Sequence, residues 1–256
     1  MRRPAVVLPQ AFGRDEFCAE RFDYHAGQHV VFGGPTQRGK TTLAFMLLEY
    51  TATPECPAYV AVCKPRDRVT QRWGKKLGFR RVEDWPPPRL LQEMIGIEPP
   101  PPGYLVWPRY GDAMRDVQEA TRVTTALLED RYAAGAREGK KRQQGIMIMD
   151  DTVVKSKVMK LDPLMTTHLA MAGAMDLGGW YFVQKPTGSG EASLWAYGAS
   201  EHIFLLNDGD VRNVKRYGEI GGVDPYYVGA CLQQLGPFQF LYIHRSTGAM
   251  AIILAQ

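Results

Sequence analysis

The sequence predicts an α/β fold in which helices sandwich a mostly parallel sheet. Three observations predict it. A glycine-rich segment at residues 34–41 lies between an apolar run and a helical pattern. Several short runs are apolar at every position, which is typical of strands buried on both faces of a parallel sheet. Helical patterns separate these runs along the chain. The 256 residues can form one large core, and we expect an N-terminal arm over residues 1–26 and a single domain over residues 27–256.

The glycine-rich segment reads Gly-Pro-Thr-Gln-Arg-Gly-Lys-Thr and matches the phosphate-binding pattern G-x-x-x-x-G-K-[ST]. Such a loop turns backbone N–H groups towards the phosphates of a nucleotide, and it needs glycine where a Cβ would collide. We expect Lys40 to reach the β- and γ-phosphates and Thr41 to ligate Mg²⁺. Residues 29–33 predict a strand before the loop and residues 42–50 a helix after it, as the pattern requires. The predicted nucleotide-binding residues are Gly34, Pro35, Thr36, Gln37, Arg38, Gly39, Lys40, Thr41 and Thr42.

A second strand is predicted at residues 58–63, and a strongly basic segment follows it over residues 64–81. Asp67 is the only acidic residue of this segment. Clustered lysine and arginine supply the sequence-independent part of DNA binding, so the segment is either a contact surface for a phosphate backbone or a solvated helix face. Its positive residues are Lys64, Arg66, Arg68, Arg72, Lys75, Lys76, Arg80 and Arg81.

Residues 85–103 form an insertion rich in proline, which cannot continue a helix or a central strand. We expect it on the surface beside the sheet, with a short helix over residues 89–97; peptide docking by its prolines is an alternative. A third strand is predicted at residues 104–107, and Asp112 is a good N-cap for a helix that runs to about residue 134. Residues 135–144 are expected to be exposed and mobile.

The apolar run at residues 146–149 ends in Asp150 and Asp151. It predicts a strand that is buried on both faces and whose tip lies beside the phosphate-binding loop. There the Asp150 carboxylate can hold Mg²⁺, directly or through water, and Asp151 can orient and deprotonate an attacking water. Two solvated acids at a strand end are the alternative, but the complete phosphate-binding loop favours the functional interpretation.

Residues 162–176 predict a helix that ends at Gly178 and Gly179. Residues 180–183 predict a fourth apolar strand, and Gln184 follows its last residue. At the tip of a strand beside the acidic pair, a neutral amide can hydrogen-bond both the γ-phosphate and the attacking water. We therefore expect Gln184 to sense which nucleotide is bound.

The last part of the chain predicts a linker at residues 189–200, a fifth strand at residues 202–206 and a β-hairpin at residues 238–254. A turn that contains glycine separates the two apolar runs of the hairpin. We expect the hairpin to cap one edge of the sheet. Arg212 is a candidate contact to a phosphate or to a neighbouring subunit.

The composition excludes several classes of protein. A net charge of +4 is only mildly basic and does not by itself argue for nucleic acid. The longest apolar run, residues 249–255, is far too short for a transmembrane segment, and no apolar core follows the basic start as in a secretory signal, so we expect a cytoplasmic protein. The scattered cysteines predict reduced thiols rather than disulfides or zinc ligands. They are Cys18, Cys56, Cys63 and Cys231.

Taken in this order, the motifs resemble those of the FtsK–HerA superfamily of P-loop ATPases over about residues 22–254. The members are ring-forming DNA pumps of chromosome segregation, conjugation and viral genome packaging, with a RecA/ASCE-like fold. Residues 179–187 carry the most specific similarity, because they look like the family's strand that ends in Thr-Gln-Arg-Pro. Residues 61–65 are similar to a strand that ends in Asp-Pro-Lys, residues 129–132 to a Glu-Arg-Arg-Tyr segment, and residues 150–151 take the place of Asp-Glu.

The resemblance implies ATP and Mg²⁺ as cofactors. It implies that Lys40 binds the β- and γ-phosphates and that Thr41 and Asp150 hold Mg²⁺. It also implies that Asp151 positions water and that Gln184 senses the γ-phosphate.

The sequence departs from the family pattern in three ways. Asp151 is one methylene shorter than the usual Glu, which can slow turnover. Lys185 replaces Arg, which keeps the charge but loses the bidentate fork. The arginine that would act on the nucleotide of a neighbouring subunit stays open among Arg122, Arg131, Arg137, Arg142 and Arg212. The chain also lacks the membrane segments and DNA-reading module of the segregation motors.

Three functional hypotheses follow. The first is an ATP-driven translocase or packaging motor for double-stranded DNA, a homo-oligomeric ring (hexamer or pentamer) that binds DNA independently of sequence and docks on a portal or secretion channel. The second is a P-loop kinase of a small molecule, against which the Gln-Lys-Pro strand end and the lack of an Arg-rich lid argue. The third is a nucleotide-dependent switch or scaffold that does not hydrolyse ATP, which the shortened Asp151 supports best.

Overall fold

The structure is a computed structural model, and it describes residues 7–88, 99–137, 145–186, 191–220 and 222–255, with the side chains of residues 191–194 left out. The described residues contain one sheet with the strand order β1-β10-β9-β8-β2-β7-β6-β3-β5-β4. The strands are β1 Ala11–Phe12, β2 Val30–Gly33, β3 Ala58–Ala61, β4 Arg80–Val82, β5 Gly103–Val106, β6 Gly145–Met149, β7 Leu177–Val183, β8 His202–Leu205, β9 Phe240–His244 and β10 Met250–Ile253.

The central part of the sheet is parallel, from β8 through β2, β7, β6, β3 and β5 to β4. Strand β7 pairs with β2 on one side and with β6 on the other. Because the carboxyl ends of parallel strands meet at one edge, this order brings together the phosphate-binding loop, the acidic pair and Gln184. The α/β fold and its mostly parallel sheet are confirmed.

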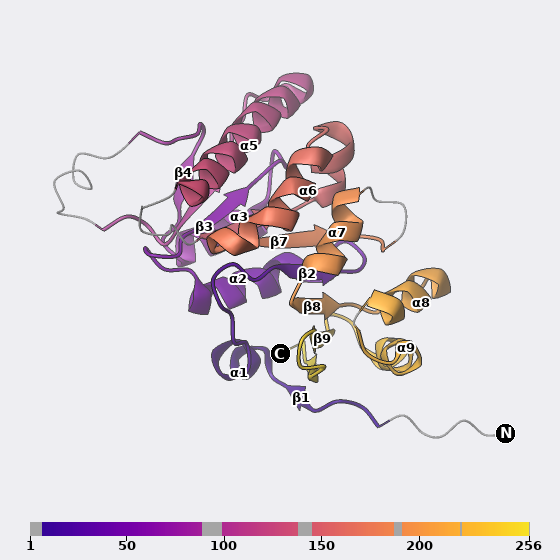
Figure 1. Ribbon diagram of the computed structural model, residues 1–256. Coiled ribbons are helices and arrows are strands. Elements are labelled where there is room, and N and C mark those ends of the chain that lie inside the picture. Colours follow the sequence, from indigo (N-terminus) through magenta and orange to yellow (C-terminus); the bar gives the residue numbers. More distant parts are fainter. Residues whose placement is uncertain (1–6, 89–98, 138–144, 187–190, 221, 256) are drawn as a thin grey trace.

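Helices cover both faces of the sheet (Figure 1). In Figure 1, α1 and α2 lie below the strands, and α5, α6 and α7 lie above them. The helices are α1 Arg14–Glu20, α2 Lys40–Thr51, α3 Arg68–Lys76, α5 Ala113–Ala136, α6 Asp162–Met171, α7 Glu191–Ala199, α8 Val211–Ile220 and α9 Pro225–Gln234. A π-helical turn at Val154–Val158 and a 3₁₀ turn at Ala172–Met175 flank α6.

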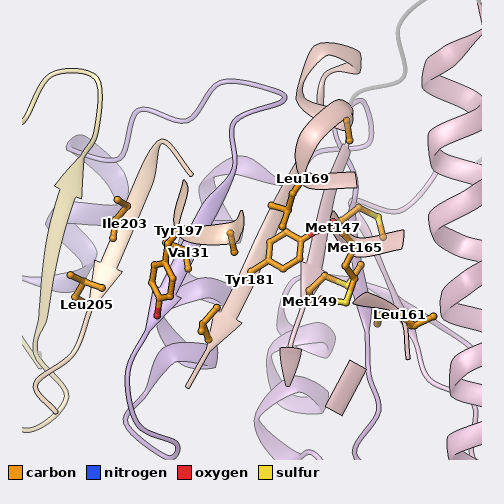
Figure 2. Packing of buried hydrophobic residues seen from close by; sticks show 14 of the residues in the cluster. Val31, Met147, Met149, Leu161, Met165, Leu169, Tyr181, Tyr197, Ile203 and Leu205 are labelled. Carbon is orange, nitrogen blue, oxygen red and sulfur yellow. Dashed lines mark hydrogen bonds between the residues drawn. The ribbon is translucent and has the colours of Figure 1, made fainter. Parts of the chain in front are cut away.

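Successive side chains of a strand point to opposite faces of the sheet, so the core is divided into two layers. Val30 and Phe32 of β2 pack with α1 and α2, while Val31 between them packs with the helices of the opposite face. Figure 2 shows this second layer, in which Tyr181 of β7 lies beside Met147 and Leu169. Since nearly every position of β2, β6 and β7 is buried, these strands read as continuous apolar runs in the sequence.

The predicted hairpin forms as β9 and β10, and β9 pairs antiparallel with β8. The hairpin was expected to cap one edge of the sheet, but β1 pairs with β10 and occupies the outermost position. The described part of residues 1–26 therefore packs on the sheet. Phe17 of α1 is fully buried and meets the ring of Tyr242 edge to face, with the centroids 4.8 Å apart.

Two predictions about local structure are wrong. Gly178 and Gly179 do not end a helix but lie inside β7. A Cβ at Gly178 would collide with the Tyr24 hydroxyl and lie 2.5 Å from the Gln28 carbonyl oxygen, so close packing rather than a turn requires glycine there. The expected linker at residues 189–200 contains α7, which packs Tyr197 into the core.

Some elements were not predicted, and some predictions lie outside the described residues. The short strand β4, the π-helical turn, α8 and α9 were all missed. The short helix expected at residues 89–97 lies outside the described residues, and so does most of the segment expected to be mobile at residues 135–144. Asp112 caps α5 as predicted, because its side chain accepts a hydrogen bond from the Arg115 backbone N–H.

The buried histidines should make the fold sensitive to acid. Burial lowers the pKa of His29 to about 4 and that of His168 to about 3. His29 Nδ1 accepts a hydrogen bond of 2.8 Å from the Gly179 N–H, and His168 Nε2 has no hydrogen-bond partner among the described residues. Both rings are therefore neutral in the folded state at pH 5, whereas the unfolded chain is protonated below about pH 6.5.

We predict that the free energy of unfolding falls as the pH drops from 6.5 towards 4. The unfolded state then binds more protons, and each histidine costs about 2 kcal/mol at pH 5. Urea denaturation at pH 7.5 and pH 5 measures the difference. The His168→Leu variant should show a smaller loss than the wild type, and an unchanged loss would contradict the assignment to His168.

Candidate functional site

A pocket of about 800 Å³ lies at the carboxyl edge of the parallel strands. The loop after β2, the segment after β3 and the tips of β6 and β7 line it. The sequence-predicted residues in its lining are Thr36, Gln37, Arg38, Gly39, Lys40, Thr41, Thr42, Asp150, Asp151 and Gln184. Gly34 and Pro35 lie at the base of the loop, where their carbonyl groups contact Lys40.

The two glycines of the phosphate-binding pattern, Gly34 and Gly39, adopt backbone angles that favour glycine. Gly34 has a φ of 134°, and a Cβ on it would lie 2.6 Å from the Leu206 Cβ. Gly39 has a φ of 86° and precedes α2, where it occupies the N-cap position. The loop therefore closes tightly against β8 and opens at the N-terminus of α2, where backbone N–H groups and the helix dipole favour an anion.

Lys40 is buried beneath the loop. Its Nζ donates to the Gly34 carbonyl oxygen at 2.5 Å and to the Pro35 carbonyl oxygen at 2.6 Å. Burial lowers the pKa of Lys40 to about 8, although Asp150 and Asp151 oppose the shift. The ammonium is thus poorly hydrated and close to the phosphate-binding N–H groups, which suits it to an anionic ligand.

Lys64, at the end of the segment after β3, pairs with both carboxylates. Its Nζ lies 2.8 Å from Asp151 Oδ2 and 3.3 Å from Asp150 Oδ2. Burial by itself would lower the pKa of Lys64, but the two aspartates raise it above its ordinary value. Burial and the neighbouring Asp151 raise the pKa of Asp150, and Lys64 opposes that rise. The sequence analysis missed this interaction, because Lys64 was assigned to a basic segment and to a strand end that resembles the family's, and no partner was predicted for its side chain.

Asp151 has a left-handed backbone, with a φ of 48°. The Asp150 side chain supports this turn, since its Oδ1 accepts a hydrogen bond of 2.8 Å from the Asp151 N–H. Aspartate is one of the few residues that adopt this conformation readily, because its short side chain can bond locally. The turn therefore gives a physical reason for Asp at this position instead of the longer Glu.

Lys155 contacts the backbone of the acidic strand end. Its side chain is fully buried in the π-helical turn, and its Nζ donates to the Asp150 carbonyl oxygen and lies 3.8 Å from Cys63 Sγ. The sequence analysis did not predict this burial, because Lys155 stands among other lysines and valines after the strand, without a recognised pattern. π-Helical turns commonly occur at functional sites.

The residues fit a Mg²⁺ ion held mainly by phosphate oxygens. The Thr41 hydroxyl and the Asp150 carboxylate line the same pocket and are the hard oxygen ligands that Mg²⁺ prefers. Within the described part of the chain, no group of three or more His, Cys, Asp or Glu residues could hold a metal by itself. Mg²⁺ is usually bound through one or two protein oxygens together with substrate phosphates.

The basic segment after β3 is divided between two environments. Arg66 and Arg68 line the pocket together with Lys64, whereas Arg72 and Lys75 lie exposed on α3. Lys76 pairs with Glu49, with Nζ and Oε2 2.7 Å apart. The basic segment therefore contributes both to the lining of the pocket and to the exposed surface of α3.

The candidate neighbour-acting arginines that the structure describes, Arg122, Arg131, Arg137 and Arg212, do not line the pocket of their own chain. Arg122 pairs with Glu119 and Asp84, and Arg131 pairs with Asp130. Arg212 is 92% exposed and lies 3.7 Å from Asp210. Arg137 follows the end of α5, and Arg142 lies outside the described residues.

No protein-family model matches the sequence, and no curated protein does either. Solved structures share the fold. The genome-packaging NTPase B204 from Sulfolobus turreted icosahedral virus 2, in complex with sulfate, matches with a TM-score of 0.57 at 11% identity, over 91% of this chain and 98% of that one. The DNA-packaging ATPase B204 from Sulfolobus turreted icosahedral virus gives a TM-score of 0.56 at 12% identity, over 91% of this chain and 100% of that one.

A secretion ATPase shares the same fold. The cytoplasmic domain of the type VII secretion ATPase EccC from Thermomonospora curvata matches with a TM-score of 0.56 at 12% identity, over 92% of this chain and 26% of that one. The fold predicted from the phosphate-binding loop and the acidic strand end is thus confirmed as that of P-loop ATPases. None of the described helices is long and apolar enough to cross a membrane.

We predict that Gly34→Ala lowers nucleotide affinity by at least about tenfold. Its Cβ would collide with Leu206 and displace the loop that holds Lys40. Isothermal titration with ATP and Mg²⁺ measures the affinity. Gly198→Ala is the matched control, because nothing lies within 4 Å of its Cβ and alanine is favoured in a helix. Equal affinities of the two variants would contradict the assigned role of the loop.

Proposed function

We propose that this protein is an ATP-hydrolysing motor that moves double-stranded DNA and works as a homo-oligomeric ring. The observation that carries the proposal is the pocket in which Lys40, Asp151 and Gln184 converge from three neighbouring parallel strands. The fold shared with packaging and secretion ATPases supports it. Two solved structures of the packaging NTPase B204 are complexes with AMPPCP and ATP-γS.

Each polar group of the pocket has a role that its position supports. The Lys40 ammonium exchanges its two carbonyl partners for the β- and γ-phosphates, where charge develops in the transition state. Asp151 accepts the proton of the attacking water, and Gln184 orients that water against the γ-phosphate. Thr41 and Asp150 would hold Mg²⁺, which would supply positive charge to the phosphate oxygens.

Turnover also requires that Asp151 be available to water. Lys64 holds its carboxylate at 2.8 Å, so this ion pair opens or lengthens before proton transfer. The pair also favours a second candidate, a nucleotide-dependent switch that binds ATP without hydrolysing it. A positive residue from a neighbouring subunit, acting on the transferring phosphoryl group, would complete the site in a ring.

The DNA-binding surface is proposed on α3. Arg72 and Lys75 are exposed there, close in sequence to Arg66 and Arg68 of the pocket. Contacts to phosphates would make binding independent of sequence and link DNA to the nucleotide through one short helix. A portal or a secretion channel is the proposed docking partner of the ring, since the fold occurs in packaging and secretion ATPases.

We predict that the purified protein hydrolyses ATP and that long duplex DNA accelerates hydrolysis. Lys40→Ala should lower turnover by about 10²-fold or more, because it removes a charge that stabilises the transition state. A phosphate-release assay with and without DNA measures this. Lys215→Ala, an exposed lysine outside the pocket, should behave as the wild type. Binding of ATP without turnover, even with DNA, would replace the motor by the switch.

We predict that DNA affinity falls steeply with salt, by about 0.9 log units per tenfold salt for each phosphate neutralised. The double variant Arg72→Gln and Lys75→Gln should bind DNA more weakly. Its plot of log affinity against log salt concentration should be less steep, by the amount expected for about two phosphate contacts. Fluorescence anisotropy with a labelled duplex, over a range of salt concentrations, gives both values. The control is Lys215→Gln on α8, which covers the opposite face of the sheet. An affinity independent of salt would contradict the proposed surface.

A further inference from the structure

A second hollow of about 290 Å³ adjoins the pocket of the phosphate-binding loop. The two share Arg38 and Phe238 in their linings. The remaining walls of the second hollow come from the end of β8 and from the turn between α9 and β9, and they include Leu206, Asn207, Leu235 and Pro237. Its surface combines apolar side chains with polar groups, among them the Asn207 amide and the Arg38 guanidinium, as in sites that accept a flat, partly polar ring.

Phe238 is held in an unusual conformation at the boundary of the two hollows. Its side chain is 46% exposed, although most phenylalanines of the chain are buried, and its backbone has a φ of 62°. Bulky residues rarely adopt such a backbone, and a strained conformation persists only where the surroundings enforce it. The ring is therefore kept at the surface by the fold and not by its own preference.

Arg14 is the residue that enforces this conformation. It is 9% exposed, and its Nη2 donates to the Phe238 carbonyl oxygen at 2.5 Å. Its Nε donates to the Leu254 carbonyl oxygen at 3.1 Å, which ties the same guanidinium to the end of the hairpin. Helix α1 and the hairpin thus fix the position of the ring.

The Phe238 ring lies against the phosphate-binding loop. A Cβ on Gly39 would lie 3.4 Å from Phe238 Cδ1, so the ring packs where the loop enters α2. The second hollow adjoins this loop through Arg38 and Phe238, so it is the candidate position for the base of a nucleotide whose phosphates bind the loop.

We propose that the second hollow is the nucleobase subsite of the protein, in which the base stacks on Phe238. The inference rests on the proposed function, since it takes ATP as the nucleotide. Aromatic rings stack on bases with an energy that is similar for all bases, so Phe238 contributes affinity rather than selectivity.

Asn207 supplies the selectivity. Its Nδ2 donates to the Leu235 carbonyl oxygen at 3.2 Å, and because a carbonyl can only accept, this bond fixes the orientation of the amide. The Asn207 Oδ1 accepts no hydrogen bond from the residues that the structure describes, so it is left as an acceptor on the other side of the amide. Adenine presents its N6 amino donor to such an acceptor, whereas guanine presents O6, a second acceptor. The subsite should therefore prefer ATP over GTP.

Binding of ATP and of inorganic tripolyphosphate, which has no base, tests the proposal. Phe238→Ala should lower the affinity for ATP by about tenfold and leave the affinity for tripolyphosphate unchanged. Phe238→Tyr keeps the ring and should bind ATP as the wild type does. Tyr50→Ala removes an exposed aromatic side chain outside both hollows and is the matched control. Equal losses for ATP and tripolyphosphate, or no loss for either, would overturn the subsite.

Two further measurements keep the test independent of protein stability and of turnover. In Phe238→Trp, ATP should quench more tryptophan emission than in the wild type, and tripolyphosphate should not. Asn207→Leu should reduce the preference for ATP over GTP, and an unchanged ratio would remove Asn207 from the subsite. If these tests succeed but the protein never hydrolyses ATP, only the proposed motor function is refuted. The subsite stands, because it is tested by binding and not by turnover.

Discussion

The position of β7 between β2 and β6 is the constraint on which the site depends. Parallel pairing on both sides fixes its register, with Val183 opposite Gly33 and Tyr181 opposite Met149. The residue that follows Val183 is therefore held between the phosphate-binding loop and the acidic pair. Two glycines make the pairing possible, since a side chain at Gly178 or Gly179 would collide with its neighbours. The chemistry at one end of β7 thus depends on close packing at the other.

Balance of charge is the second condition of the site. Lys64 and Lys155 both contact the acidic pair, Lys64 through the carboxylates and Lys155 through the Asp150 carbonyl group. Lys40 is buried beside them, with its pKa lowered to about 8. Arg66 and Arg68 add positive charge at the mouth of the pocket. The pocket has more cationic side chains than the two aspartates can neutralise. Phosphate groups would neutralise the remaining positive charge, so the pocket suits a polyanionic ligand.

The sequence predicted the parts of this arrangement that local patterns encode. Apolar runs identified the buried strands, and the residues after them, Asp150 and Gln184, do share a pocket with Lys40. What it could not predict depends on contacts between distant segments. The burial of Lys155 and the pairing of Lys64 follow from the order of strands, which no single segment determines. Gly178 and Gly179 were interpreted as a helix end because glycine is common there, whereas tertiary packing decided their place.

The N-terminal segment also shows that contacts between distant segments could not be predicted from the sequence. It adds Arg14 to the surroundings of the pocket, outside the phosphate-binding pattern. From sequence, residues 1–26 have little regular character. In the fold, α1 places Phe17 in the core and sends Arg14 between the hairpin and Phe238. The first helix and the last strands of the chain therefore meet at the wall of the pocket, where Phe238 is part of the lining. Through its two hydrogen bonds, Arg14 links this wall to Leu254 at the end of the hairpin, on the side of the sheet farthest from the basic helix α3.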